Sequence, residues 1–111
     1  MSNEITGLSL CDVADAIRSR KLSATEVMEA TLARIERLQP IVNAFILLEG
    51  NRAMEAAQVA DELQANGEDL PSLHGVPMAH KDLLYRTGRV STCGSKIRSE
   101  VKAGVTATAL E

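Results

Sequence analysis

Hydrophobic residues recur at helical spacing in three stretches of this chain. Residues 9–39 contain two such patterns, one after Ser9 and one after Ser23, and each serine is followed three residues later by an acid. A hydroxyl that caps free N–H groups, with an acid three residues on, is typical of a helix start. The third stretch, residues 52–66, repeats alanines and larger apolar residues before a stop signal at Gly67. We therefore predict a helical region over 9–39 and a further helix over 52–66.

Two other stretches are apolar without a helical period. Residues 41–48 follow Pro40, which we expect to end the preceding helix, and are almost continuously apolar. Such a run is typical of a strand buried on both faces, which implies helices on both sides of a sheet. Residues 76–81 predict a second strand with Pro77 near its start. The pattern as a whole predicts an α/β fold with no domain boundary inside residues 1–111.

Composition and charge narrow the possible functions. At 111 residues the chain is one domain at most, and aromatic residues make up only 2% of it, so its core would rest on Ala, Leu, Val and Ile. A net charge of −3 makes direct nucleic-acid binding unexpected, because such proteins normally present a basic face. Two cysteines do not suggest a disulfide framework, and no long apolar run precedes or crosses the domain. We expect a cytoplasmic protein that does not span a membrane.

The strongest chemical lead is Lys81, which stands with Asp82 at the end of the apolar, Gly- and Pro-punctuated run 73–79. Lysine ammonium groups are seldom buried without a partner, and a lysine in a dry pocket has a lowered pKa and can act as a base. A second interpretation of the same pattern is a solvated charge at the end of a strand. Asp82 is adjacent to Lys81 on the predicted strand, where neighbouring side chains face opposite ways, so we expect it to bond to backbone groups.

Residues 73–82, Leu-His-Gly-Val-Pro-Met-Ala-His-Lys-Asp, followed by Thr92, Gly94 and Ser95, resemble the amidase signature family. This family of serine hydrolases includes the A subunits of aminoacyl-tRNA amidotransferases and fatty-acid amide hydrolase. A second likeness is Asn-Ala-Phe at residues 43–45, after the helix-rich N-terminus. Family members run to several hundred residues, so the resemblance implies a truncated N-terminal portion of their mixed-sheet α/β/α fold. It would contain the first helices and the first strands.

The resemblance also implies a catalytic role for one residue. Amidase signature enzymes use a Ser-cisSer-Lys triad, and Lys81 matches its lysine. The two serines lie in a Gly/Ser-rich stretch that these 111 residues do not contain, because none of the seven glycines is paired with another. Ser95 lacks flanking oxyanion donors, and we expect it to satisfy backbone groups of a turn instead. The expected activity is hydrolysis of amide carbon–nitrogen bonds, with the chain inactive by itself.

The remaining expectations concern ligands and partners. We predict no cofactor and no metal, because His74 and His80 match no zinc spacing with Cys93 or Asp82, and we expect each histidine to be hydrogen-bonded in a loop or strand. The substrate of the complete enzyme would be a small amide. The alternative function is a non-catalytic truncated paralogue that binds a protein partner. Either form is open to self-association through exposed sheet edges.

Overall fold

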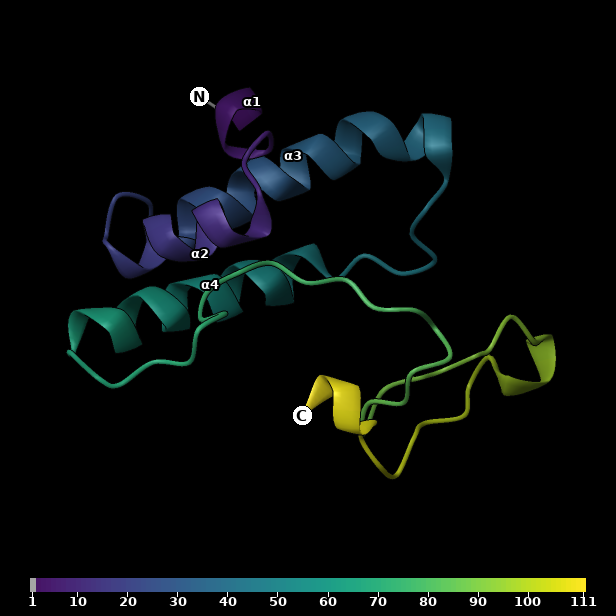
Figure 1. Cartoon of the computed structure of the whole chain (residues 1–111). Coiled ribbons are helices and arrows are strands. Elements are labelled where there is room, and N and C mark those ends of the chain that lie inside the picture. The colour runs from purple at the N-terminus through teal and green to yellow at the C-terminus, as the bar shows by residue number, and fades with distance from the viewer. Residues whose placement is uncertain (1) are drawn as a thin grey trace. The chain divides into compact units, whose positions relative to one another are not determined.

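The computed structural model of the protein describes residues 2–111, which form two compact units that divide after Pro77. The first unit contains four α-helices, coloured purple to teal in Figure 1. The second contains two short 3-10 turns, η1 and η2, and extended loops. The elements are α1 (Ser2–Ile5), α2 (Leu10–Arg18), α3 (Ala24–Val42), α4 (Gly50–Ala65), η1 (Lys96–Arg98) and η2 (Thr108–Leu110).

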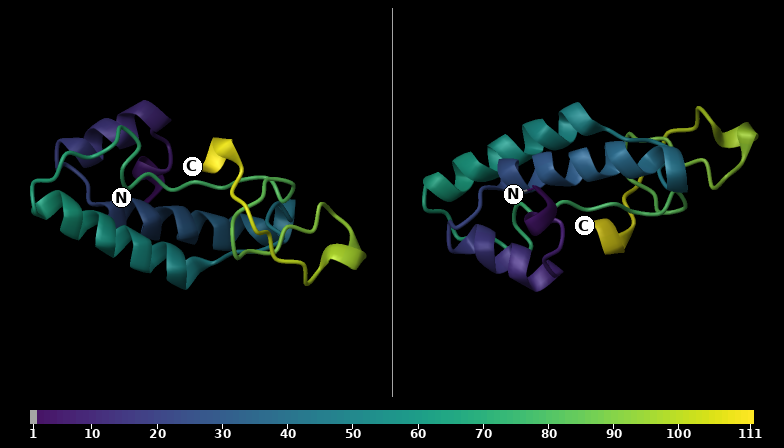
Figure 2. Two further views of the ribbon diagram at one scale, coloured as in Figure 1. Left: turned by 90° about the horizontal axis from the view of Figure 1, so that it is seen from below. Right: turned by 90° about the horizontal axis from the view of Figure 1, so that it is seen from above.

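The first unit is built on α3 and α4, which run antiparallel and lie side by side in both views of Figure 2. One cluster joins Val13 and Ile17 of α2 to Val27 of α3, and a second joins Ala24 of α3 to alanines of α4. Small side chains at the helix contacts let the helices approach closely, but each buries little apolar area. The core is therefore modest, as the low aromatic content predicts.

Local sequence signals place the starts of α2 and α3 correctly. Ser9 and Ser23 are the N-caps, and each forms a capping box with the acid three residues later. At α3 the hydroxyl of Ser23 accepts the backbone N–H of Glu26 at 3.0 Å, and a Glu26 carboxylate oxygen accepts the N–H of Ser23 at 2.8 Å. Both helices therefore begin where the serine-acid pattern predicts. The helix predicted over 52–66 is confirmed as α4, and Gly67 follows it with a φ of +73°.

The end of α3 differs from the prediction, because the helix continues through Pro40 to Val42. A proline in the last helical turn removes only one N–H donor, and the turn is stabilised from outside. The side-chain oxygen of Gln39 accepts the backbone N–H groups of Ala44 and Phe45, and its NH₂ donates to the Phe45 carbonyl at 2.8 Å. Asn43 then ends the helix in a left-handed conformation.

The two predicted strands are absent from the described residues. Residues 41–42 complete α3, residues 43–49 form a loop, and residues 76–81 have no regular structure. A strand needs a neighbour to satisfy its backbone groups, and no described segment forms a ladder with either stretch. The helical part of the predicted α/β fold is thus observed, whereas its sheet is not. The apolar run stays exposed, with Ile46 77% accessible.

The second unit, residues 78–111, is held by hydrogen bonds between two extended segments. Residues 87–90 pair with residues 102–103 through isolated β-bridges, and the Gly88 N–H donates to the Ala103 carbonyl at 2.9 Å. Among the described residues of this unit, no hydrophobic side chain is fully buried. Its order therefore rests on polar contacts rather than on an apolar core. No helix within residues 2–111 has the length and apolar character needed to cross a membrane.

Candidate functional site

Lys81 lies in the second unit at the start of a turn. Its carbonyl accepts the N–H of Leu84 at 3.0 Å and lies 3.2 Å from Nδ1 of His80, a contact that requires the Nδ1–H form of the imidazole. The side chain of Lys81 is exposed. The burial predicted for it on an apolar strand is not observed, because the strand does not form and Met78, which should help to cover it, is itself 73% exposed.

Asp82 turns away from Lys81 toward a neighbouring loop. One carboxylate oxygen accepts the backbone N–H of Thr92 at 3.1 Å, and the other accepts the Thr92 hydroxyl. The hydroxyl bond chiefly, and then the backbone bond, lower the pKa of Asp82 below its ordinary value, against a small opposing effect of desolvation. The expectation that Asp82 bonds to backbone groups is therefore confirmed.

Ser91 supplies a second link to the same residue from the opposite direction. It is the one buried polar side chain found in the described residues, 3% exposed, and its hydroxyl donates to the backbone carbonyl of Asp82. Nε of Arg98 in η1 donates to the Ser91 carbonyl at 3.3 Å. Three hydrogen bonds thus join Asp82 to Ser91 and Thr92, one to its carbonyl and two to its carboxylate.

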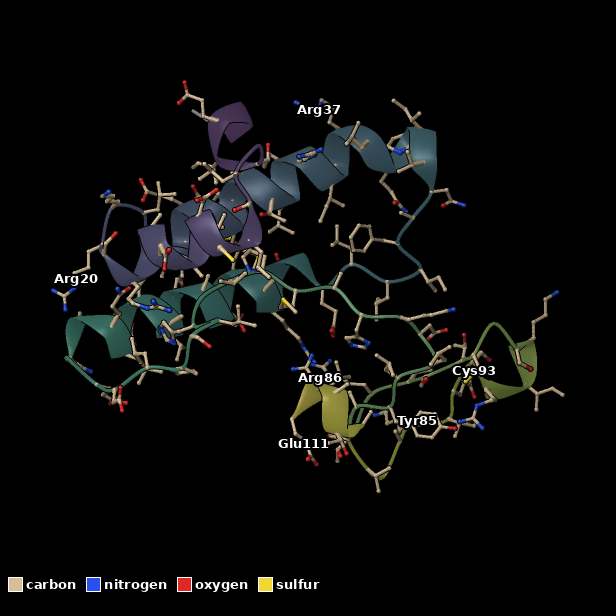
Figure 3. All side chains as sticks on the ribbon, viewed as in Figure 1. Arg20, Arg37, Tyr85, Arg86, Cys93 and Glu111 are labelled. Atoms are coloured by element: carbon tan, nitrogen blue, oxygen red, sulfur yellow. The ribbon has the colours of Figure 1, made fainter. Side chains whose placement is uncertain are left out.

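Arg98 connects this cluster to Tyr85, which is labelled in Figure 3. The guanidinium lies 5.5 Å from the centroid of the Tyr85 ring and also donates to its hydroxyl at 3.2 Å. A cation over an aromatic face is attracted by the ring quadrupole. Sequence reasoning did not single out either residue. Their separation of 13 positions is set by the path of the loop, which no local pattern in the sequence reveals.

The segment 92–95 makes a tight turn. The Ser95 N–H donates to the Thr92 carbonyl at 2.9 Å, and Cys93 and Gly94 both have positive φ values, 51° and 76°. Positive φ at both central residues is characteristic of a type I′ turn, and glycine adopts it at little cost. The Thr92 hydroxyl also accepts the Gly94 N–H at 3.1 Å. The side chain that satisfies this turn is therefore Thr92, rather than Ser95 as the sequence suggested.

The two histidines are hydrogen-bonded, as predicted. His74 belongs to the first unit, where its Nε2 lies 2.7 Å from the Ala60 carbonyl of α4, and His80 contacts the Lys81 carbonyl. Within residues 2–111 no three His, Cys, Asp or Glu side chains gather closely enough to hold a metal ion. Cys11 and Cys93 are exposed free thiols. The polar groups that the second unit does bring together are those of Asp82, Ser91 and Thr92, and Lys81 precedes Asp82 in the chain.

A sequence model of the Amidase family matches residues 26–111, and the chain belongs to this family. The match contains Lys81 and the whole segment from Leu73 to Asp82, so the resemblance read from these residues is confirmed. Curated relatives include the A subunits of two glutamyl-tRNA(Gln) amidotransferases. That of Ectopseudomonas mendocina is 40% identical over 94% of this chain, and that of Pseudomonas fluorescens Pf-5 is 41% identical over 91%.

A similar solved structure is described as revealing "the evolutionary origins of an s-triazine catabolic enzyme" through "an unexpected vestigial protein complex". It superposes with a TM-score of 0.81 at 33% identity and covers 89% of this chain. The chain spans only a fraction of each of these proteins, namely 21% of the two curated relatives and 22% of the solved chain. The residues described above are therefore one part of the length over which these relatives extend.

Proposed function

We propose that Lys81 is the lysine of a Ser-cisSer-Lys triad in an amidase that hydrolyses carbon–nitrogen bonds of amides. The observation that carries the proposal is the Amidase match across residues 26–111, which includes the Gly-Val-Pro and Lys-Asp elements that precede and contain the lysine. The Lys81 side chain is exposed on a hydrogen-bonded turn, so these residues alone do not form the dry pocket that a base needs. Such a side chain is available to a partner outside the described residues.

In this proposal the two serines come from sequence beyond these 111 residues, and the sheet of the α/β/α fold is completed there as well. An uncharged Lys81 would take a proton through the first serine, and the second serine would attack the amide carbon. The amine leaves with a proton, and water then releases the acyl group. Apolar residues supplied by the completed fold would provide the dry surroundings that keep the lysine uncharged. The chain by itself, holding one triad member of three, is expected to be inactive.

The proposed substrate is a small amide in the cytoplasm. Two of the similar proteins carry names that refer to glutamyl-tRNA(Gln) amidation, and the solved one refers to s-triazine catabolism, so the family match does not choose between these classes. The net charge of −3 favours a small substrate over direct contact with nucleic acid by this segment. Neither a cofactor nor a metal takes part in the proposed chemistry.

A chimera tests the proposal. The full chain, residues 1–111, replaces the matching segment of the E. mendocina amidotransferase, and release of ammonia from the host enzyme's amide substrate is measured. Lys81→Ala should lower kcat by about 10²- to 10⁴-fold, the usual contribution of a general base. Lys81→Arg should not restore activity, because a guanidinium stays charged. Lys96→Ala, which removes an exposed lysine of η1, is the matched control and should change little. Near-normal turnover by Lys81→Ala, or a folded but inactive chimera, would contradict the assignment.

A second candidate function is a non-catalytic module that binds a protein partner. It is favoured by the exposed apolar side chains of residues 41–48, which no described segment covers. Gel filtration of the 111-residue chain separates the two candidates. A well-behaved monomer with ordered tertiary structure favours the independent module, whereas aggregation or an expanded state with exposed hydrophobic surface favours part of a larger enzyme.

A further inference from the structure

The backbone that follows the Cα atom of Lys81 is anchored by hydrogen bonds, while the Lys81 side chain is not. The Lys81 carbonyl accepts the Leu84 N–H at 3.0 Å, which closes the turn, and lies 3.2 Å from Nδ1 of His80. Immediately after Lys81, Asp82 is bonded through its carboxylate and through its carbonyl. The peptide group between Lys81 and Asp82 is thereby restrained by its neighbours. Only the side-chain torsions of Lys81 remain free to adjust to a partner.

The hydrogen bonds that hold Asp82 all come from one loop, residues 91–92. The carboxylate of Asp82 takes both the N–H and the hydroxyl of Thr92, and its carbonyl takes the hydroxyl of the buried Ser91. Arg98 in turn holds the Ser91 carbonyl at 3.3 Å. A carboxylate that receives two donors from one residue is restricted in orientation as well as in position. The 91–92 loop and the 81–82 peptide therefore move together.

The same contacts hold the negatively charged carboxylate of Asp82 on Thr92. An adjacent free carboxylate would favour the ammonium form of a lysine, which is unsuitable for a base. Both carboxylate oxygens of Asp82 are instead bonded to Thr92, and no ion pair joins this carboxylate to Lys81 within residues 2–111. The lowered pKa of Asp82 agrees with a carboxylate that stays ionised and bonded in this place.

We infer that Asp82, bonded to Thr92, is a positioning residue that fixes the backbone from which Lys81 reaches its partner. This inference rests on the proposed function of Lys81 as the base. It assigns to Asp82 and to the Thr92 hydroxyl a role in placing another group, without contact with the substrate. A small displacement of a reacting group lowers the rate by a large factor. Loss of the bonds between Asp82 and Thr92 should therefore lower kcat more than it changes KM.

The first test uses the chimera and measures hydrogen exchange at single backbone amides. Asp82→Asn and Thr92→Val should speed exchange at the Thr92 amide and at the Leu84 amide, which is bonded to Lys81, by roughly tenfold. Thr92→Ser keeps both donors and should exchange like the wild type. Glu100→Gln and Thr108→Val are matched controls, because both side chains are exposed in the same unit. If the exchange rate of the Leu84 amide is unchanged in Asp82→Asn, the bonds between Asp82 and Thr92 do not hold the Lys81 backbone, and the inference is wrong.

The second test measures the chimera's kinetics with the same variants. Asp82→Asn and Thr92→Val should lower kcat by roughly 10- to 100-fold with KM unchanged within about twofold, and Thr92→Ser should restore turnover. Equal losses for Thr92→Ser and Thr92→Val, or a change in KM alone, would overturn the positioning role. Activity that survives Lys81→Ala would instead refute the proposed function. Full loss with Lys81→Ala, together with wild-type rates for Asp82→Asn, would refute only the inference.

Discussion

The backbone at Gly75 lies close against buried side chains of α2 and α3. Its φ is +74°, and a Cβ atom built on it would lie 2.9 Å from Cβ of Ala24 and 3.4 Å from Cγ2 of Ile17. Real Cβ atoms do not approach a neighbouring carbon so closely, and both neighbours are buried. The glycine therefore lets the 66–77 loop lie directly over the contact between α2 and α3. The residue fits the position for two independent reasons, its backbone conformation and the absence of a side chain.

Replacing Gly75 should therefore destabilise the fold more than the backbone conformation alone explains. We expect Gly75→Ala to cost about 2–4 kcal/mol, from a positive φ and from overpacking against Ala24. Gly67→Ala is the matched control, since Gly67 has a φ of +73° in the same unit but nothing within 4 Å of the added atom. It should cost only about 1 kcal/mol. Urea unfolding followed by circular dichroism measures both, and equal losses would show that the contact with Ala24 relaxes without cost.

At the site, sequence reasoning predicted the bonding of Asp82 to backbone groups but not its partner Thr92, and the role of Lys81 stays a prediction. The Gly-Val-Pro and Lys-Asp order is a local signal and is visible in the printed sequence. Thr92 is ten positions away and Arg98 a further six, so their contacts depend on the path of the intervening loop. Polar residues in loops are common, and nothing in their spacing distinguishes these two from their neighbours.

At the scale of elements, α3 receives an unusual cap from another helix. Asp61 of α4 accepts the backbone N–H groups of Ala24 and Thr25, at 2.7 and 3.1 Å, and the Thr25 hydroxyl at 2.6 Å. These donors lie in the first turn of α3, where N–H groups have no partner within the helix and a negative charge is favoured. Partial burial raises the pKa of Asp61, but the bonds from Thr25 and Ala24 outweigh it and the net pKa is lowered. Asp61 thus joins the two longest helices.

The cap makes stability depend on pH in a defined direction. A carboxyl whose pKa is lower when folded stabilises the protein above its unfolded value of about 4, and the stabilisation is lost as the pH falls toward the folded pKa. We expect Asp61→Ala to lower the free energy of unfolding by about 1–3 kcal/mol at pH 7. This difference from the wild type should shrink as the pH falls below about 4. Unfolding curves from about pH 7 to about pH 3 measure it.

Glu62→Ala provides the comparison for this prediction, because Glu62 is the exposed neighbour of Asp61 on the same helix. It should change stability by less than about 0.5 kcal/mol, as exposed substitutions usually do. A gap between Asp61→Ala and the wild type that stays constant down to about pH 3 would mean that the carboxylate charge contributes nothing to the cap.

Helices were predictable from sequence because their signals are local, and strands were not. Ser9 and Ser23 identify two helix starts from residues within one turn, and the caps form as predicted. Residues 41–48 are apolar, but they do not form the predicted strand, because the pairing of strands depends on residues distant in sequence. Even the end of α3 was set by an interaction outside the helix, in which Gln39 binds the backbone of the following loop.

For the whole molecule, the two units differ in what holds them. All the buried hydrophobic residues found in residues 2–111 belong to the first unit, whereas the second relies on hydrogen bonds between exposed segments. Local stability follows buried apolar contact and protection of backbone bonds from water. The units are therefore expected to open with different free energies. Denaturation curves of the whole chain should not be interpreted as one two-state transition without testing this point.

Hydrogen exchange of the 111-residue chain checks the expected difference. Amides in the packed parts of α3 and α4, such as Ala30 and Ala60, should exchange at least about 100-fold more slowly than that of Gly88. Gly88 is a fair comparison because its N–H is also hydrogen-bonded, to the Ala103 carbonyl. Similar protection at all three amides would show that the units unfold together. Thr108→Val, which alters an exposed residue of the second unit, should leave the exchange of α3 and α4 unchanged.

The pairing of α3 with α4 also bears on synthesis by the ribosome. The two helices are joined by a short loop, and the loop containing Gly75 follows within the same unit, so every contact of the first unit is made by residues up to Pro77. Contacts between elements close in sequence form quickly, because little loop entropy is lost. The helical unit can therefore fold as soon as these residues have left the exit tunnel. Lys81 and its anchoring loop emerge afterwards, when the helices are already packed.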